Sequence, residues 1–157
     1  MSGGIISNVQ VKSISPDELS KVKRSFTTRR VPQHDICSII CSDAAPKIGD
    51  LVFAVVDKIG SHPKIELPNG RRAALSAGDM ILVVYGNRYA PDQFEAVMPR
   101  SLEACHLVAA GGIASTKISK HDSMANPTRI TPVGLAGNRR GDVLNVREGG
   151  LELLPVV

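Results

Sequence analysis

Short apolar runs separated by turn residues fill the middle of the chain. Runs rich in Val, Ile and Leu at 36–41, 50–59 and 80–85 have the length of buried strands. The segment 62–70 alternates and closes on Pro-Asn-Gly, a hairpin turn that makes 71–75 the return strand. Many short strands joined by such turns are typical of small barrels and sandwiches. We therefore predict a mainly β fold, a small closed or partly open β-barrel.

One short N-terminal α-helix is predicted ahead of these strands. Ser15 is followed three residues later by Glu18, with Pro16 at the first helical position. This spacing forms a capping box with a preorganised start. The acidic residues come early and the basic residues late, which complements the helix dipole. We expect the helix to run from about Pro16 to Phe26.

Gly-Asp steps precede three apolar runs, at 49–50, 78–79 and 141–142. Each places a turn residue where the chain bends, and the Asp side chain can accept hydrogen bonds from local backbone amides. Together with its strands, segment 50–85 resembles in a general way the small closed barrels used as accessory domains in translation factors and transcription regulators. The resemblance implies a barrel and carries over no site residue.

The C-terminal half carries weaker periodicity. Residues 101–112 fit either a short helix or a strand at 105–110, and the flanking glycines favour the strand. A polar loop is predicted over 115–129, followed by two or three short strands within 130–157. The whole chain, 1–157, has the length of one domain, which we divide into an arm and helix (1–35) and a barrel core (36–157).

Composition narrows the class of protein. Aromatic residues make up 3% of the chain and Trp is absent, so the core must be aliphatic and base stacking has few rings to use. Cys37 and Cys41 lie in an apolar run and are predicted to be core residues; with Cys105 they make an odd number without a CxxC pair. These features favour a reducing, cytoplasmic setting. No run reaches the roughly 18 apolar residues of a membrane span, and no signal peptide is expected.

The net charge of +4 permits an anionic partner without requiring one. Basic residues cluster after the predicted helix start, where an anion-binding strip is a candidate: Lys23, Arg24, Arg29 and Arg30, beside Lys21. Such a strip could hold phosphate oxygens of nucleic acid. A solvated helical face is the simpler interpretation, and docking onto an acidic protein surface is a further one.

Motifs for common chemistries are missing from the sequence. Paired glycines at 111–112 precede Ser115 and Thr116 without the spacing of a phosphate-binding loop, so close strand packing is the preferred interpretation. The four histidines lack metal-ligand spacing, and we predict no metal and no cofactor. The run 121–123, His-Asp-Ser, is interpreted as a solvated turn because triads assemble in space, not from sequence neighbours.

The densest candidate site is the stretch 85–99, which directly follows a buried strand. It carries most of the aromatic residues of the chain beside an Arg and two carboxylates. Its candidate binding residues are Arg88, Tyr89, Asp92, Phe94 and Glu95. Tyr and Arg anchor many interfaces, and loops on rigid scaffolds concentrate binding residues. The structural alternative is an Arg–carboxylate pair that pins a loop while Tyr85, Tyr89 and Phe94 cover one end of the core.

These observations predict a non-enzymatic binding or assembly module that contacts a partner protein through the 85–99 loop. One alternative is an enzyme for a small anionic substrate, with Asp92 or Glu95 as acid or base and Arg88 as clamp. Another is a nucleic-acid-binding protein that uses the basic strip. We expect no membrane association, and self-association stays open.

Overall fold

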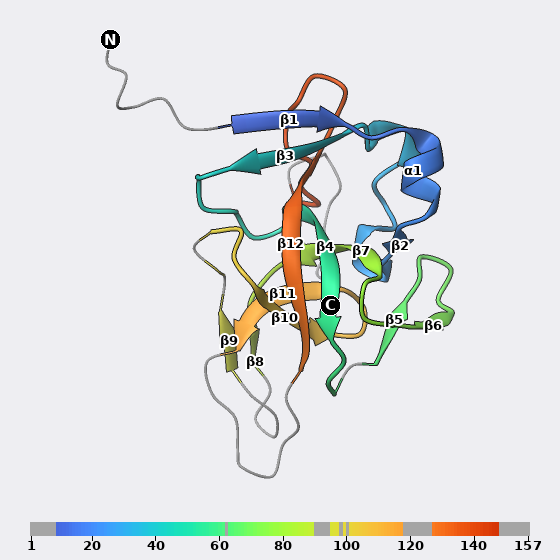
Figure 1. Ribbon diagram of the computed structural model, residues 1–157, viewed down its shortest axis with the longest axis vertical. Coiled ribbons are helices and arrows are strands. Elements are labelled where there is room, and N and C mark those ends of the chain that lie inside the picture. Colours follow the sequence, from blue (N-terminus) through green and yellow to red (C-terminus); the bar gives the residue numbers. More distant parts are fainter. Residues whose placement is uncertain are drawn as a thin grey trace.

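The computed structural model describes residues 9–61, 63–89, 95–97, 99, 101–117 and 127–147. It is mainly β, and its centre is a closed five-stranded barrel, as the turn-rich strand pattern predicted (Figure 1). The pairing closes through β4 (Leu51–Lys58), β7 (Met80–Tyr85), β11 (Ile113–Lys117), β10 (Cys105–Ala109) and β12 (Thr128–Gly137). The pair β7–β11 is parallel, and the other four pairs of this ring are antiparallel.

Two arms extend the sheet beyond the barrel. On one side β3 (Ser38–Ser42) pairs with β12, and β1 (Val9–Ser13) pairs with β3. On the other side β9 (Glu95–Val97) pairs with β11, and β8 (Arg88–Tyr89) pairs with β9. The predicted hairpin forms a separate small sheet of β5 (Lys64–Glu66) and β6 (Arg72–Ala74).

The barrel strands β4 and β7 are buried on both faces, which explains why their sequences are continuous apolar runs. One face of each strand points into the barrel core, with Val52 and Val83 fully buried there. The opposite face, including Phe53 and Leu82, packs under the segment 14–36. The core is aliphatic, as the composition predicted; the large aromatic side chains that are fully buried are Phe53 and Tyr85.

The N-terminal helix begins as predicted and ends earlier. Ser15 Oγ accepts from the amide of Glu18 at 3.0 Å, and Glu18 Oε1 accepts from the amide of Ser15 at 2.8 Å. The helix α1 is Pro16–Ser20, so the expected end at Phe26 is wrong. The reason is tertiary: β2 (Lys23–Arg24) pairs in parallel with β7. Two short 3-10 turns follow, η2 (Phe26–Thr28) and η3 (Gln33–Asp35).

Two of the three Gly-Asp steps act as predicted. The carboxylates of Asp50 and Asp79 each accept a hydrogen bond at 2.8 Å from the amide three residues earlier. The preceding glycines, Gly49 and Gly78, share a φ of 95°, a left-handed conformation that suits glycine. In the third turn a different side chain takes this role, since Asn138 Oδ1 accepts from the amides of Arg140 and Asp142.

The C-terminal half differs from the sequence-based boundaries. The strand predicted at 105–110 is confirmed as β10. The expected polar loop begins later, because 115–117 belong to β11, and residues 118–126 lie outside the described part. Within the described residues 127–147, where short strands were expected, ten residues form the long strand β12, which has two register shifts and pairs with both the barrel strands and β3. The predicted turn at 148–150 lies outside the described residues.

The cysteine prediction is wrong for two residues. Cys105 is buried inside the barrel, whereas Cys37 and Cys41 are only half-buried. Both half-buried cysteines lie at the β3 arm, which extends beyond the closed barrel and is less completely covered. Burial raises the pKa of the Cys105 thiol to about 12. Within the described residues, no helix has the length and apolar character to cross a membrane.

Candidate functional site

The stretch 85–99 begins inside the core and continues as a hairpin outside the barrel. Tyr85 is fully buried, so an exposed tyrosine in this stretch would have to be Tyr89, whose side chain lies outside the described residues. The Tyr85 hydroxyl has no hydrogen-bond partner among the described residues, and burial raises its pKa. A tyrosine at the end of a buried strand fills the barrel core, which matches the structural alternative for this residue.

Beyond Tyr85 the backbone forms strand pairs. Arg88 lies opposite Ala96, and Tyr89 lies opposite Glu95. Glu95 begins β9, so the described residues 95–97 of this stretch are a strand. Asp92 and Phe94 lie outside the described residues, as do the side chains of Arg88, Tyr89 and Glu95. The roles predicted for these five residues stay predictions.

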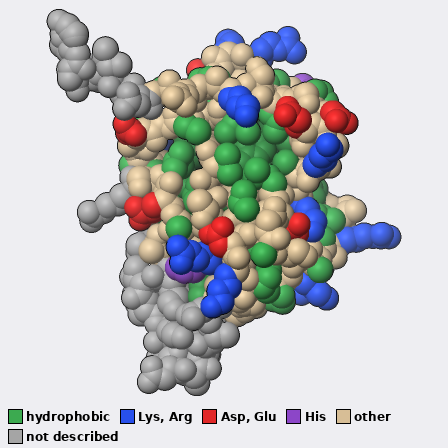
Figure 2. All heavy atoms as spheres, in the orientation of Figure 1, with side chains coloured by type: hydrophobic (Ala, Val, Ile, Leu, Met, Phe, Trp, Pro, Cys, Tyr) green, Lys and Arg blue, Asp and Glu red, His purple; other side chains and the backbone are tan. Residues whose placement is uncertain are grey.

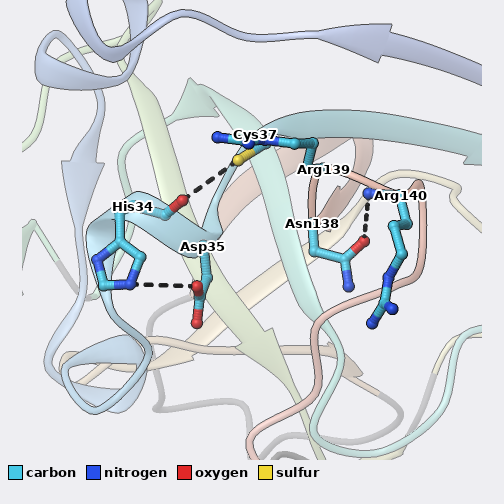
Figure 3. Close-up of a pocket in the computed structure, with 6 residues that line it drawn as sticks. All are labelled: His34, Asp35, Cys37, Asn138, Arg139 and Arg140. Carbon is cyan, nitrogen blue, oxygen red and sulfur yellow. Dashed lines mark hydrogen bonds and ion pairs between the residues drawn. The ribbon is translucent and has the colours of Figure 1, made fainter.

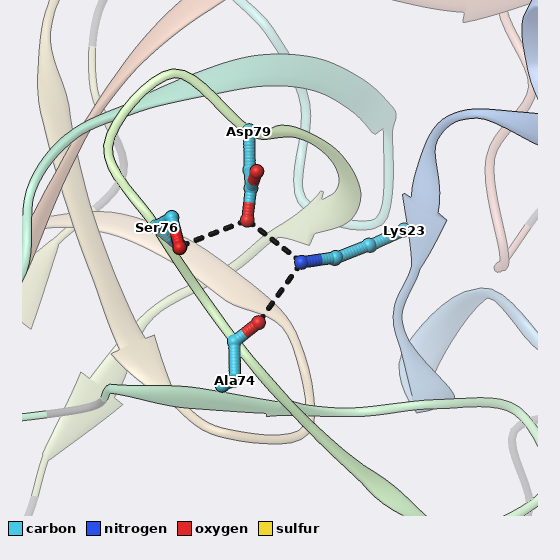
Figure 4. Close-up of polar contacts among 4 residues, drawn as sticks. All are labelled: Lys23, Ala74, Ser76 and Asp79. Carbon is cyan, nitrogen blue, oxygen red and sulfur yellow. Dashed lines mark hydrogen bonds and ion pairs between the residues drawn. The ribbon is translucent and has the colours of Figure 1, made fainter.

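Two residues of the predicted basic strip are engaged within the fold. Lys23 Nζ contacts Asp79 Oδ2 at 2.7 Å and the carbonyl of Ala74 at 2.9 Å (Figure 4). The bond from Lys23, together with the amide of Ser76, lowers the pKa of the Asp79 carboxyl. Lys23 thus ties the N-terminal segment to the turn between β6 and β7.

Arg24 is the more deeply placed of the two. Its guanidinium donates to the carbonyls of Thr28 and Val31 and, through Nε, to Thr28 Oγ1 at 3.2 Å. Burial lowers the pKa of this guanidinium. A fork that already closes its own loop has fewer donors left for phosphate oxygens.

The remaining basic residues of the strip are exposed. Arg29 stacks over the Phe26 ring with 3.8 Å from Cζ to the ring centroid, and it donates to the Phe26 carbonyl at 3.1 Å. Arg30 and Lys21 are exposed as well. Four residues that look like one strip in sequence therefore divide into two that hold the fold and two that face solvent.

The space beside the paired glycines is occupied by the segment that contains Ser25 and Thr27. A Cβ on Gly112 would lie 2.1 Å from Ser25 Oγ, and Thr27 Oγ1 donates to the Gly112 carbonyl at 2.8 Å. The amide of Thr27 donates to the Gly111 carbonyl at 3.0 Å. Close packing, the preferred interpretation of this pair, describes the observed contacts.

An open cleft of about 350 Å³ lies where η3 meets the turn after β12 (Figure 3). It is lined by His34, Asp35, Cys37, Asn138, Arg139 and Arg140. These residues form no motif in the sequence, because the two halves of the cleft are about a hundred residues apart and look like an ordinary connector and an ordinary turn. The signal available was the Arg-Arg pair inside a Gly-Asn turn.

The polar contacts of the cleft are those of a surface recess. His34 Nε2 lies 3.4 Å from Asp35 Oδ1, and the His34 side chain is 84% exposed. Cys37 Sγ donates to the His34 backbone carbonyl at 3.3 Å, and Figure 3 shows the imidazole directed at Asp35, not at the thiol. The imidazole contacts a carboxylate and the thiol contacts a backbone carbonyl, so the two side chains are not arranged as a nucleophile and its base. The two arginines could contact an anionic group.

The described residues also bear on the other candidate chemistries of the sequence. The run 121–123 lies outside the described residues. Across the described part of the chain, no group of three His, Cys, Asp or Glu side chains is arranged to hold a metal ion. No protein family, curated protein or solved structure matches this chain.

Proposed function

We propose that the protein is a non-enzymatic binding module that contacts a partner protein through the 85–99 hairpin. The observation that carries the proposal is that the two halves of β11 pair with different strands. Ile113 and Ala114 pair with β7 and close the barrel, whereas Thr116 and Lys117 pair with β9. The hairpin is therefore built on a barrel strand but lies outside the barrel ring.

A hairpin placed in this way suits recognition. Backbone pairing to a rigid barrel fixes the hairpin before a partner arrives, which reduces the entropy lost on binding. Arg88 and Tyr89 form β8, the last of the described strands on this side of the sheet. Residues of these two types are frequent anchors of protein interfaces.

The experiment compares the wild type with the double variant Arg88→Ala/Tyr89→Ala. Immobilised protein is exposed to native lysate, and captured proteins are quantified by mass spectrometry. We expect the variant to lose the captured partner while its melting temperature changes little. The control, Arg29→Ala/Arg30→Ala, removes two exposed arginines elsewhere and should keep the partner. Unfolding of the double variant, or equal capture by both proteins, would contradict the proposal.

The enzyme alternative has a separate outcome in the same experiment. If the hairpin clamps a small anionic substrate, a small molecule is detected in the eluate of the wild type and is missing from that of the double variant, while the captured proteins are the same for both. The nucleic-acid alternative is less well supported, because Lys23 and Arg24 make the intramolecular contacts described above.

A further inference from the structure

Strand β1 is an open edge of the sheet. It pairs with β3 on one side, and within the described residues no strand pairs with its other side. All five of its residues are exposed, including Val9 at 50% and Val11 at 54%. Figure 1 shows β1 near the top of the molecule, with β3 beneath it, α1 following its right-hand end and the loop after β12 rising above it in this view.

The hydrogen-bonding groups of the open edge can be assigned from one contact. The amide of Ile14 donates to the carbonyl of Cys37 at 3.0 Å, in line with the β1–β3 register. Backbone groups alternate in direction along a strand, so Lys12 and Gln10 also turn their N–H and C=O groups toward β3. Val9, Val11 and Ser13 therefore turn theirs outward.

We propose that β1 pairs with β1 of a second copy of this chain, antiparallel and centred on Val11. In this register Val11 exchanges both backbone hydrogen bonds with Val11 of the second copy. Val9 and Ser13 lie opposite each other and do the same. Every outward N–H and C=O of the strand then has a partner, and Lys12 lies opposite the uncharged Gln10.

Neighbouring registers are less favourable for stated reasons. Centring the pair on Lys12 places two lysines directly opposite each other, which is destabilising. Centring it on Gln10 leaves the outward groups of Ser13 beyond the paired region. The register on Val11 is therefore selected by both charge and hydrogen bonding.

The edge has little of the usual protection against such pairing. Natural edge strands are shortened, bulged or interrupted by Pro or charge. β1 has five residues in regular register, contains no Pro or Gly, and carries one charge, Lys12. The strand at the opposite end of the sheet, β8, has only two described residues.

Apolar contacts add to the backbone pairing. The two Val11 side chains would lie side by side on one face, beside the turn at Gly141. A Cβ added to Gly141 would lie 3.7 Å from Val11 Cγ2, so this turn is close to the Val11 side chain. In Figure 2 apolar side chains gather over the region where β3 and β12 meet, below β1. An antiparallel pair about a two-fold axis joins like faces, so the two apolar regions would lie on one continuous sheet. One strand pair is a small interface, and we expect association to depend on concentration.

The register predicts a cross-link that forms only between two different variants. In a Cys37→Ser/Cys41→Ser background, Gln10→Cys and Lys12→Cys are prepared separately. Residues 10 and 12 of opposite copies form a non-hydrogen-bonded pair with Cα atoms about 4.5 Å apart, within disulfide range. Identical positions are offset by two residues, about 8 Å, beyond that range. Mild oxidation of the mixture should give a disulfide dimer, and either variant alone should give none.

A second measurement uses proline to separate the two edges of β1. Val11→Pro removes an outward N–H and leaves the β3 ladder intact, whereas Lys12→Pro removes a bond to β3. By analytical ultracentrifugation at up to several hundred micromolar, the wild type should dimerise and Val11→Pro should stay monomeric with a nearly unchanged melting temperature. Lys12→Pro should melt earlier. A monomeric wild type, a dimer that survives Val11→Pro, or a mixture that fails to cross-link would overturn the proposal.

Discussion

Asn145 Nδ2 donates to Asp50 Oδ1 at 2.9 Å, and both side chains are almost fully buried. The same amide group donates to the carbonyl of Ile48 at 3.0 Å, and Asn145 Oδ1 accepts from the amide of Arg147 at 2.7 Å. Asp50 belongs to the Gly-Asp turn immediately before β4, and Asn145 lies in the segment that follows β12. The Asn145 carboxamide therefore links the segment that follows β12 to the turn that precedes β4.

Asn145→Asp should destabilise the protein in a pH-dependent way. It places a second carboxylate within hydrogen-bond distance of Asp50, and two buried carboxylates cannot both ionise without repulsion. The pKa of the pair is then raised above its unfolded value, so the variant is most stable below the unfolded pKa and loses stability as pH rises through the folded one. Urea unfolding at pH 4 and pH 7 measures the difference.

The control for this variant is Asn69→Asp. Asn69 accepts from the amide of Arg71 at 2.9 Å in the exposed β5–β6 turn, a local role like that of Asn145 toward Arg147. A carboxylate can accept the same bond there, so stability should change little with pH. If Asn145→Asp is as stable as this control at pH 7, the buried Asn145–Asp50 pair does not control the stability of the fold.

Gly112→Ala should cost far more than Gly70→Ala. Both glycines have positive φ, 108° and 87°, which costs an L-residue about 1 kcal/mol or more. A Cβ at Gly70 would meet nothing within 4 Å, whereas one at Gly112 would lie 2.2 Å from Ser25 Cβ. Chemical unfolding of the two variants isolates the steric part. Equal losses would mean that the Ser25 segment moves aside at little cost.

Arg24→Ala should destabilise the fold, and Arg30→Ala should not. Hydrogen bonds to a charged group contribute about 1.5–3 kcal/mol, and Arg24 donates to two backbone carbonyls that would lose their partner. Arg30 is exposed and provides the matched control.

The same proteins, titrated with single-stranded and duplex oligonucleotides at low salt, test the basic strip. Binding lost on Arg30→Ala, with the fold retained, would favour nucleic-acid recognition.

The Lys23–Asp79 contact should contribute stability that disappears in acid. Because the folded pKa of Asp79 is lowered, its contribution is present above the unfolded pKa, near 4, and is lost as pH falls through the folded value. The ion pair is partly exposed, so the effect should be modest and salt-sensitive. Unfolding of the wild type and Asp79→Asn between pH 2 and pH 6 should converge at the acid end. A constant difference between the two curves across this pH range would show that the charge on Asp79 contributes nothing.

The local rules of the sequence determined the elements that depend on neighbouring residues. The capping box at Ser15, the hairpin turn at 68–70 and the Asp side chains of two Gly-Asp turns all satisfy groups within four positions, so their spacing alone predicts them. The apolar runs likewise predicted β4, β7 and a barrel. The core was expected to be aliphatic, and it is.

Tertiary structure decided what depends on distant partners. The helix ends at Ser20 because the next residues pair with β7, and Tyr85 is buried because its strand continues into the barrel. Lys23 and Arg24 look like free cations in sequence, but Asp79 and the carbonyl of Val31 engage them. The cleft joins His34 to Arg139 for the same reason. Local patterns fix which groups need partners, whereas only the packed chain selects the partner, because burial and long-range pairing outweigh weak local preference.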